Sequence, residues 1–262
     1  MNARRLTLAL VIATALLISM PVSAANDGLA LTFQQGNQAY DLKNYEQALA
    51  HYQQLIRMGV VDGRLYYNMG NAHYRKGEIG QAILFYSRAQ RLLPGDPDIK
   101  ANLTLARAST RDKLPTDEPA LPFLVLGWPF FNLSRDSLFA WALVVYLITA
   151  ALILFRISSR SDVIRRRATQ AAALLALIFI FVAANYSFRL RADVIRAEAV
   201  VLEPEVTVRS GPGESFAEIF KVHAGAEIKI HNIRENWFHV SLTNELAGWV
   251  PSTAVERILQ DP

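Results

Sequence analysis

The sequence predicts a multidomain membrane protein made of an all-α repeat domain, two transmembrane helices and an all-β barrel. Three observations predict this fold class. A 34-residue repeat fills residues 29–96, two uncharged apolar runs follow at 137–155 and 168–188, and residues 197–259 alternate apolar and polar side chains between glycine turns. Of the 262 residues, 52% are hydrophobic, which is high for an ordinary soluble domain.

The N-terminus has the pattern of a secretory signal. Two arginines precede the uncharged residues 6–20, and Pro21 then precedes a run of small residues. We therefore expect a signal peptide at residues 1–25, with cleavage after Ala24 or Ala25. An uncleaved anchor helix is the alternative, and either version would export the residues that follow.

Two helical repeats are predicted at residues 29–62 and 63–96, with a capping helix at 97–111, and together they form an exported domain. In each repeat, the second helix carries one apolar stripe at spacings of three and four residues. Asp96 as N-cap and Pro97 at the first helical position begin the capping helix. A cap is needed because each repeat buries its apolar face only against its neighbours.

The second repeat resembles the tetratricopeptide repeat. Residues 66–77 read Tyr-Tyr-Asn-Met-Gly-Asn-Ala-His-Tyr-Arg-Lys-Gly, and Ala82, Tyr86 and Pro94 follow at the consensus positions. The first repeat matches less closely, because Lys43 stands where the turn glycine is usual. The resemblance implies a helix–turn–helix array that binds proteins.

The tetratricopeptide resemblance also implies a ligand groove lined by the first helix of each repeat. The matching positions are Phe33, Asn37, Tyr40, Tyr67, Asn71 and Tyr74. We expect an extended peptide or a partner helix in this groove, held by amide contacts and rigid tyrosines. The alternative is that the tyrosines pack between helices and the asparagines are solvated. Some family members clamp a C-terminal carboxylate; Asn37 and Asn68 fit that pattern, but Phe33 and Asp98 stand where lysines would be expected.

Residues 137–155 and 168–188 are predicted transmembrane helices, since about 20 apolar residues cross a bilayer core. Buried core helices are the alternative. The loop between them, at residues 156–167, holds one acid, Asp162, and five basic side chains: Arg156, Arg160, Arg165, Arg166 and Arg167. Such a loop stays in the cytoplasm, so both flanking domains are expected on the exported side.

The linker at residues 114–136 is rich in proline and aromatic residues, and we expect it at the membrane interface or packed beneath the repeats.

Residues 197–259 are predicted to form an all-β domain. The segment 206–213, Val-Thr-Val-Arg-Ser-Gly-Pro-Gly, and the Gly-Trp-Val around Trp249 look like a bacterial SH3 barrel. Trp237 and Trp249 are candidate ligand contacts, but we expect at least one of them in the core.

No catalytic residue, cofactor or metal site is predicted. The chain has no cysteine, its five histidines lack ligand spacing, and no nucleophile elbow or phosphate-binding loop is present. The 27 Lys and Arg residues exceed the 23 Asp and Glu residues, yet residues 192–262 hold six basic and eleven acidic side chains. The basic excess lies beside the apolar runs, so no nucleic-acid partner is expected.

The order of these modules resembles the BatE-type membrane proteins of bacterial aerotolerance operons. This resemblance implies a non-enzymatic scaffold in a cell-envelope complex of the inner membrane, with both domains in the periplasm. It further implies von Willebrand A-domain membrane proteins and a MoxR-type ATPase as partners. The alternative function is a cell-wall sensor that binds peptidoglycan through the SH3-like domain.

Overall fold

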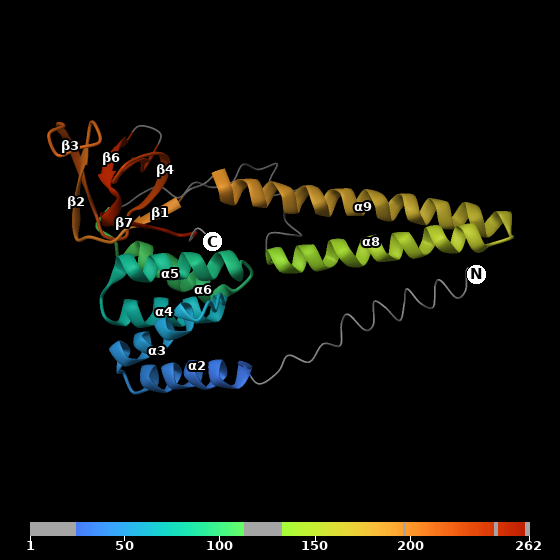
Figure 1. The fold of residues 1–262 in the computed structure, drawn as a ribbon, viewed down its shortest axis with the longest axis horizontal. Coiled ribbons are helices and arrows are strands. Elements are labelled where there is room, and N and C mark those ends of the chain that lie inside the picture. The colour runs from blue at the N-terminus through green and yellow to red at the C-terminus, as the bar shows by residue number, and fades with distance from the viewer. Residues whose placement is uncertain (1–24, 113–132, 196–197, 244–245, 260–262) are drawn as a thin grey trace.

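The computed structural model describes residues 25–112, 133–195, 198–243 and 246–259 (Figure 1). Residues 1–24 of the predicted signal peptide and most of the predicted linker lie outside these residues. The described chain forms a helical domain, a long helical hairpin and an antiparallel sheet.

The helical domain is an array of antiparallel helices in residues 25–112. Its elements are α2 (Ala25–Asp41), α3 (Tyr45–Arg57), α4 (Gly63–Arg75), α5 (Ile79–Leu92) and α6 (Pro97–Ala108). The side chain of Asp62 caps α4 and that of Asp96 caps α6, because each accepts hydrogen bonds from two backbone amides of the first turn. The predicted start of the capping helix is therefore confirmed.

The two repeats share close contacts and turn geometry. Gly70 of α4 packs against the ring of Tyr86, so closely that a Cβ there would overlap the ring, and Gly36 does the same with Tyr52. Lys43 adopts a left-handed φ of 61°, which matches the φ of 79° at Gly77, 34 residues later. The first repeat therefore keeps the turn conformation although it lacks the glycine that favours it.

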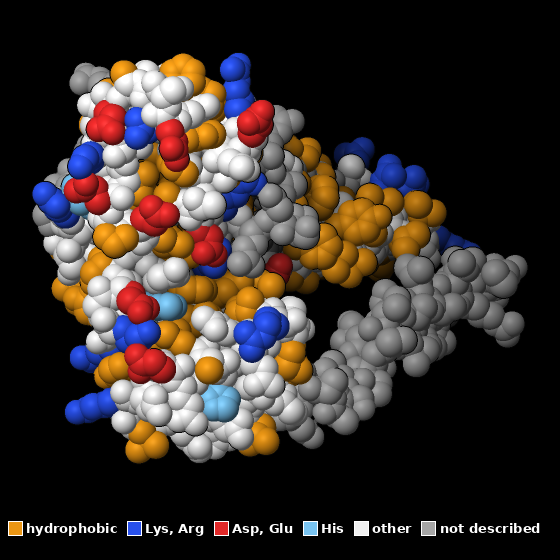
Figure 2. Space-filling model, turned by 60° about the vertical axis from the view of Figure 1, so that its left-hand side comes forward, with side chains coloured by type: hydrophobic (Ala, Val, Ile, Leu, Met, Phe, Trp, Pro, Cys, Tyr) orange, Lys and Arg blue, Asp and Glu red, His pale blue; other side chains and the backbone are white. Residues whose placement is uncertain are grey.

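A helical hairpin of α8 (Arg135–Ser158) and α9 (Asp162–Ile195) extends away from both domains (Figure 1). By length and composition, both helices are apolar enough to cross a membrane. Most of their side chains are exposed, and Figure 2 shows the apolar surface that results. The arginine-rich segment 156–167, expected as a loop, is mostly helical; only residues 159–161 lie outside the helices, because arginine is a good helix former.

The C-terminal domain is one antiparallel sheet with the order β3-β2-β6-β5-β4-β1-β7. Its strands are β1 (Glu198–Val201), β2 (Glu205–Arg209), β3 (Glu218–His223), β4 (Glu227–Arg234), β5 (Trp237–Ser241), β6 (Ala247–Pro251) and β7 (Val255–Arg257). The sequence predicts a closed barrel, but the strand pairing describes an open sheet. Among the described residues, the outer strands β3 and β7 do not pair with each other.

The sheet and the repeat domain share a hydrophobic core. Ile83 of α5 and Leu103 of α6 are fully buried in one cluster with Val200 of β1 and Ile258, which follows β7. Gly80, at the start of α5, lies so close to β1 that a Cβ would be 2.9 Å from the carbonyl oxygen of Val201. The two domains, which residues 113–197 separate in the chain, therefore pack as one body (Figure 1).

Charged side chains surround this shared core. Arg107 of α6 forms two hydrogen bonds of 2.7 Å with the carboxylate of Glu227 on β4. Arg91 of α5 lies 2.7 Å from a carboxylate oxygen of Glu198 on β1. Each pair joins the helical domain to the sheet. Charged hydrogen bonds are directional, whereas apolar burial is not, so these pairs help to fix the relative orientation of the two domains.

Candidate functional site

The six predicted groove residues lie on two neighbouring helices. Phe33, Asn37 and Tyr40 are on α2, and Tyr67, Asn71 and Tyr74 are on α4. All six are half-buried. Helix α4 contacts α2 on one side and α6 on the other, so the first helices of the repeats form one continuous surface.

A ladder of amide side chains joins these helices. The Oδ1 atom of Asn37 accepts a hydrogen bond of 2.8 Å from the Tyr52 hydroxyl and one of 2.9 Å from Nδ2 of Asn68. This arrangement recurs in the second repeat. There, Oδ1 of Asn71 accepts from the Tyr86 hydroxyl at 2.8 Å and from Nδ2 of Asn102 at 2.9 Å.

The ladder depends on neutral, buried tyrosines. Burial raises the pKa of Tyr52 and of Tyr86 well above the usual range, so both hydroxyl groups remain protonated donors at neutral pH. Both rings are almost fully buried, so the acceptors on Asn37 and Asn71 satisfy groups that would otherwise be unpaired. The two asparagines are therefore structural, which the sequence does not predict.

The ladder also has an unused side. No described residue accepts a hydrogen bond from Nδ2 of Asn37 or Asn71, and none donates to Oδ1 of Asn68 or Asn102. Each asparagine pair thus offers an amide NH2 group and a carbonyl oxygen that make no hydrogen bond within the described residues. A peptide backbone carries the same two groups, so it can pair with either rung of the ladder.

The predicted aromatic residues are partly used for packing. The ring of Phe33 lies 6.0 Å from that of Tyr52, and the ring of Tyr67 lies 6.0 Å from that of Tyr86. Tyr40 packs on Tyr45 at 5.4 Å. The alternative interpretation of the groove is therefore right in part, since tyrosines pack between helices although the residues remain only half-buried.

Trp237 and Trp249 lie on β5 and β6 of the sheet, far from the ladder in the chain. Neither ring belongs to the buried core, so the expectation that at least one fills the core is wrong. On β6 the buried residues are Gly248 and Val250, and because strand side chains alternate, Trp249 points to the opposite face. There its ring lies 5.1 Å from that of His239.

Sequence reasoning misses Asn102 as a member of the site. Its signal is its spacing, because Asn102 follows Asn68 by one 34-residue repeat. The capping helix α6 therefore continues the ladder instead of only covering the end of the array.

The comparison with known families agrees with this geometry. The family model described as tetratricopeptide repeat matches residues 33–97, which run from the ladder's first helix into α6. These residues form tetratricopeptide repeats. A search of curated proteins finds no match to the chain.

Proposed function

We propose that the chain is a non-enzymatic, membrane-anchored scaffold that binds protein partners through its repeat groove. Tetratricopeptide repeats are protein-interaction modules, which supports the binding role. The observation that carries the anchoring role is the joint core of α5, α6 and β1. It unites two domains that are separated in the sequence by both apolar helices.

The shared core supports a specific topology. The repeat domain precedes α8 and the sheet follows α9, so domains in contact must lie on the same side of any membrane that these helices cross. Two crossings meet this condition, whereas one crossing would separate the domains. The signal pattern and the arginines at the hairpin tip favour the exported, periplasmic side of a bacterial inner membrane.

Two finer assignments complete the proposal. The sheet is of the SH3-like type, supported by its antiparallel order and by the irregular register between Ile230 and Asn232, a feature typical of strongly bent strands. The complex is of the Bat aerotolerance type, with von Willebrand A-domain proteins and a MoxR-type ATPase as partners. The order of the modules supports this assignment.

One observation favours a second function, which is peptidoglycan binding by the sheet. The ring of His239 lies between those of Trp249 and His231, at 5.1 and 6.0 Å. The guanidinium of Arg234 lies 5.8 Å from the Trp249 ring. Aromatic rings in a row on a sheet face can stack on sugars or peptides, so a pull-down by purified peptidoglycan would favour this function over the scaffold.

Cysteine labelling in intact cells tests the topology. The chain has no cysteine, so Glu46→Cys, Ser161→Cys and Glu214→Cys each introduce a unique thiol at an exposed position. A maleimide that cannot cross the inner membrane should label the first and third variants and spare the second. Labelling of Ser161→Cys alone, or of only one of the two domains, contradicts the proposal.

Affinity capture tests the groove with a variant chosen to keep the fold. Asn68→Ala/Asn102→Ala removes the outer amides but leaves the hydroxyl groups of Tyr52 and Tyr86 bonded to Asn37 and Asn71. Partners recovered with the wild-type chain in mild detergent should be lost with this variant. Asn236→Ala, at an exposed position in the turn between β4 and β5, is the control and should retain them. Unchanged recovery with the groove variant contradicts the binding role.

A further inference from the structure

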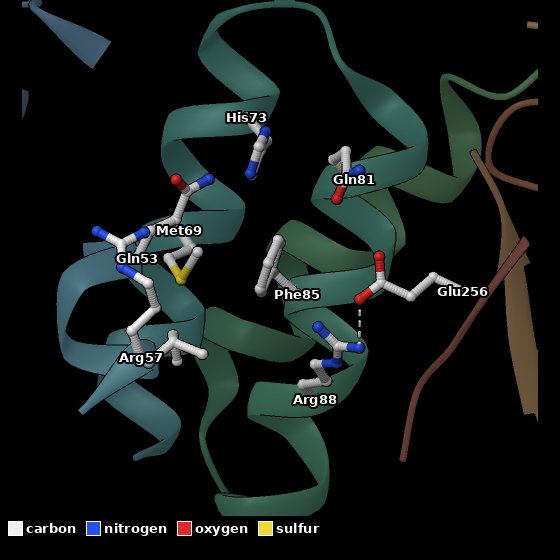
Figure 3. A pocket seen from close by; sticks show the side chains of 9 residues that line it. Gln53, Arg57, Met69, His73, Gln81, Phe85, Arg88 and Glu256 are labelled. Atoms are coloured by element: carbon white, nitrogen blue, oxygen red, sulfur yellow. Dashed lines mark hydrogen bonds and ion pairs between the residues drawn. The ribbon is translucent and has the colours of Figure 1, made fainter. Parts of the chain in front are cut away.

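A pocket of about 280 Å³ lies on the opposite face of α4 from the asparagine ladder. Its walls come from α3, α4, α5 and Glu256 of β7, so it borders the junction between the two domains (Figure 3). Met69 and His73 line it, and with 3.6 residues per helical turn they point away from Tyr67 and Asn71. The pocket is therefore distinct from the proposed peptide groove.

His73 and Arg88 are the buried polar residues that line this pocket, and Arg88 is paired with Glu256. The His73 side chain is 9% exposed, and its Nδ1 atom lies 2.6 Å from Oε2 of Glu78. Since a carboxylate can only accept, Nδ1 carries the proton and Nε2 is left as an acceptor. Burial lowers the pKa of His73, which keeps the ring neutral and preserves this acceptor.

The acceptor on His73 has no protein donor. Nε2 is buried and, among the described residues, has no hydrogen-bond partner. Figure 3 shows the ring standing at one end of the pocket, above Phe85 and Met69. A buried acceptor without a partner is rare in native proteins, so a ligand that brings a donor would complete the site.

The remaining walls define that ligand. The His73 ring is stacked on the Phe85 ring, with centroids 5.2 Å apart, and Ile56 and Met69 add apolar surface. Arg57 lies at the exposed rim, and Arg88 lies 5.2 Å from the Phe85 centroid. Arg88 is paired with Glu256 at 2.7 Å, so Arg57 leaves the lining with a net positive charge. This charge disfavours an ammonium or guanidinium donor and favours a neutral donor, such as a hydroxyl, on an apolar body.

The size of the pocket limits the ligand further. Sites for drug-sized ligands occupy roughly 300–1,000 Å³. A pocket slightly below this range holds one ring with a small substituent. Flat walls of Phe85 and His73 favour an aromatic ring, which stacks on or packs edgewise against them.

We propose that this pocket binds a phenol group, with the ring against Phe85 and Met69 and the hydroxyl donating to Nε2 of His73. The phenol can belong to a tyrosine side chain of a protein partner or to a free small molecule. The proposal does not depend on the groove, because the two sites lie on opposite faces of α4.

Methyl NMR of the full chain in detergent tests the proposal. N-acetyltyrosine amide and N-acetylphenylalanine amide differ by one hydroxyl, and phenol represents the free small molecule. At least one phenolic probe should shift the Met69 methyl signal saturably and leave that of the exposed Met58 unchanged. The tyrosine amide should bind about ten-fold tighter than the phenylalanine amide, since one hydrogen bond to a buried acceptor separates them.

Two variants and one control complete the test. His73→Phe keeps a ring on Phe85 but removes the acceptor, so the preference for the hydroxyl should disappear. Gln53→Trp places a large side chain at the exposed rim and should weaken all probes, while His51→Phe, outside the pocket, should change nothing.

The outcomes distinguish the two sources of the phenol from each other and from failure of the proposal. Binding of the tyrosine amide supports a protein tyrosine, and binding of phenol alone supports a free small molecule. The absence of a saturable Met69 shift with either phenolic probe overturns the proposal. It is also overturned if the hydroxyl preference survives in His73→Phe.

Discussion

The guanidinium of Arg88 and the carboxylate of Glu256 lie 2.7 Å apart, although 168 residues separate them in the chain. Arg88 is 4% exposed and also donates to the backbone carbonyl groups of Arg257 and Ile258. One cation of the repeat domain thus holds three acceptors of the C-terminal domain. The two domains are therefore joined by a buried, directional contact as well as by their shared apolar core.

Replacement of Arg88 by alanine should weaken the contact between the two domains and lower the stability of the protein. It removes the hydrogen bonds that Arg88 donates to the carboxylate of Glu256 and to the backbone carbonyl groups of Arg257 and Ile258. We expect a loss of about 3 kcal/mol in the free energy of unfolding. The value lies at the low end for buried pairs because Glu256 is partly exposed and stays hydrated. Urea titration followed by tryptophan fluorescence measures this loss. Arg64→Ala, at an exposed position on α4, is the control and should change stability little.

A charge reversal tests the pair of Arg107 and Glu227. Arg107→Glu and Glu227→Arg should each lower the free energy of unfolding by about 1 kcal/mol, because like charges then face each other near the surface. The double variant should recover most of this loss. A double-mutant cycle by urea titration gives the coupling energy directly, and a coupling near zero would show that the pair does not hold the domains.

The asparagine ladder predicts an asymmetry within each pair. Asn71→Ala leaves the buried Tyr86 hydroxyl without its acceptor and should cost about 1–3 kcal/mol. Asn102→Ala removes the donor to Asn71 and to the Tyr67 hydroxyl at the half-buried edge. Asn71 keeps its bond from the buried Tyr86 hydroxyl, so the cost should be smaller. Thermal unfolding of the two variants measures the difference. Equal destabilisation by both would contradict the structural role of Asn71.

Local sequence patterns predict the elements but not their assembly. The 34-residue period, the Asp96 cap and the apolar runs depend on neighbours in the chain, and the structure contains the corresponding helices. The bond between Arg88 and Glu256 depends on residues 168 positions apart, for which a single sequence offers no signal. From the sequence alone, Arg88 is therefore expected to be an ordinary surface residue of a repeat, and only the structure brings Glu256 beside it.

The candidate groove is predictable to the same limited extent. The repeat period identifies Asn37 and Asn71, but it does not show that their carbonyl oxygens accept hydrogen bonds from Tyr52 and Tyr86.

The prediction for Trp249 fails because alternation defines the two faces of a strand without showing which face is buried. Gly248 and Val250 take the buried face, so the larger side chain lies outside.

Acidification should destabilise the repeat domain through His73. Burial lowers the pKa of His73 in the folded state, whereas in the unfolded state it returns to about 6.5. Between these values the unfolded state binds more protons, so the free energy of unfolding decreases as the pH falls. The charged groups that influence His73 are Glu78, Lys76 and Glu256.

Thermal unfolding between about pH 7.5 and pH 5.5 measures this effect, because that window lies above the ordinary range of carboxylates. The wild-type melting temperature should decrease with acidification, and that of His73→Phe should decrease less. His51→Phe should follow the wild type. Parallel curves for all three proteins would show that His73 does not contribute.

Gly80 provides the most local test of domain docking. It lies at the start of α5, where an added Cβ would be 2.9 Å from the Val201 oxygen and 3.2 Å from the Gly225 nitrogen. Both are backbone atoms, which cannot rotate away, so Gly80→Ala must push α5 from the sheet. We expect a loss of about 1–3 kcal/mol, typical of overpacking. Hydrogen exchange should also become faster at the Gly225 amide, which donates to the carbonyl oxygen of Val201 at 2.8 Å.

Gly28→Ala is the matched control, because Gly28 lies in α2 and an added Cβ would have no neighbouring atom within 4 Å. That variant should gain about 0.5–1 kcal/mol from helix propensity. If Gly80→Ala behaves like Gly28→Ala, helix α5 and the sheet do not pack this closely in solution.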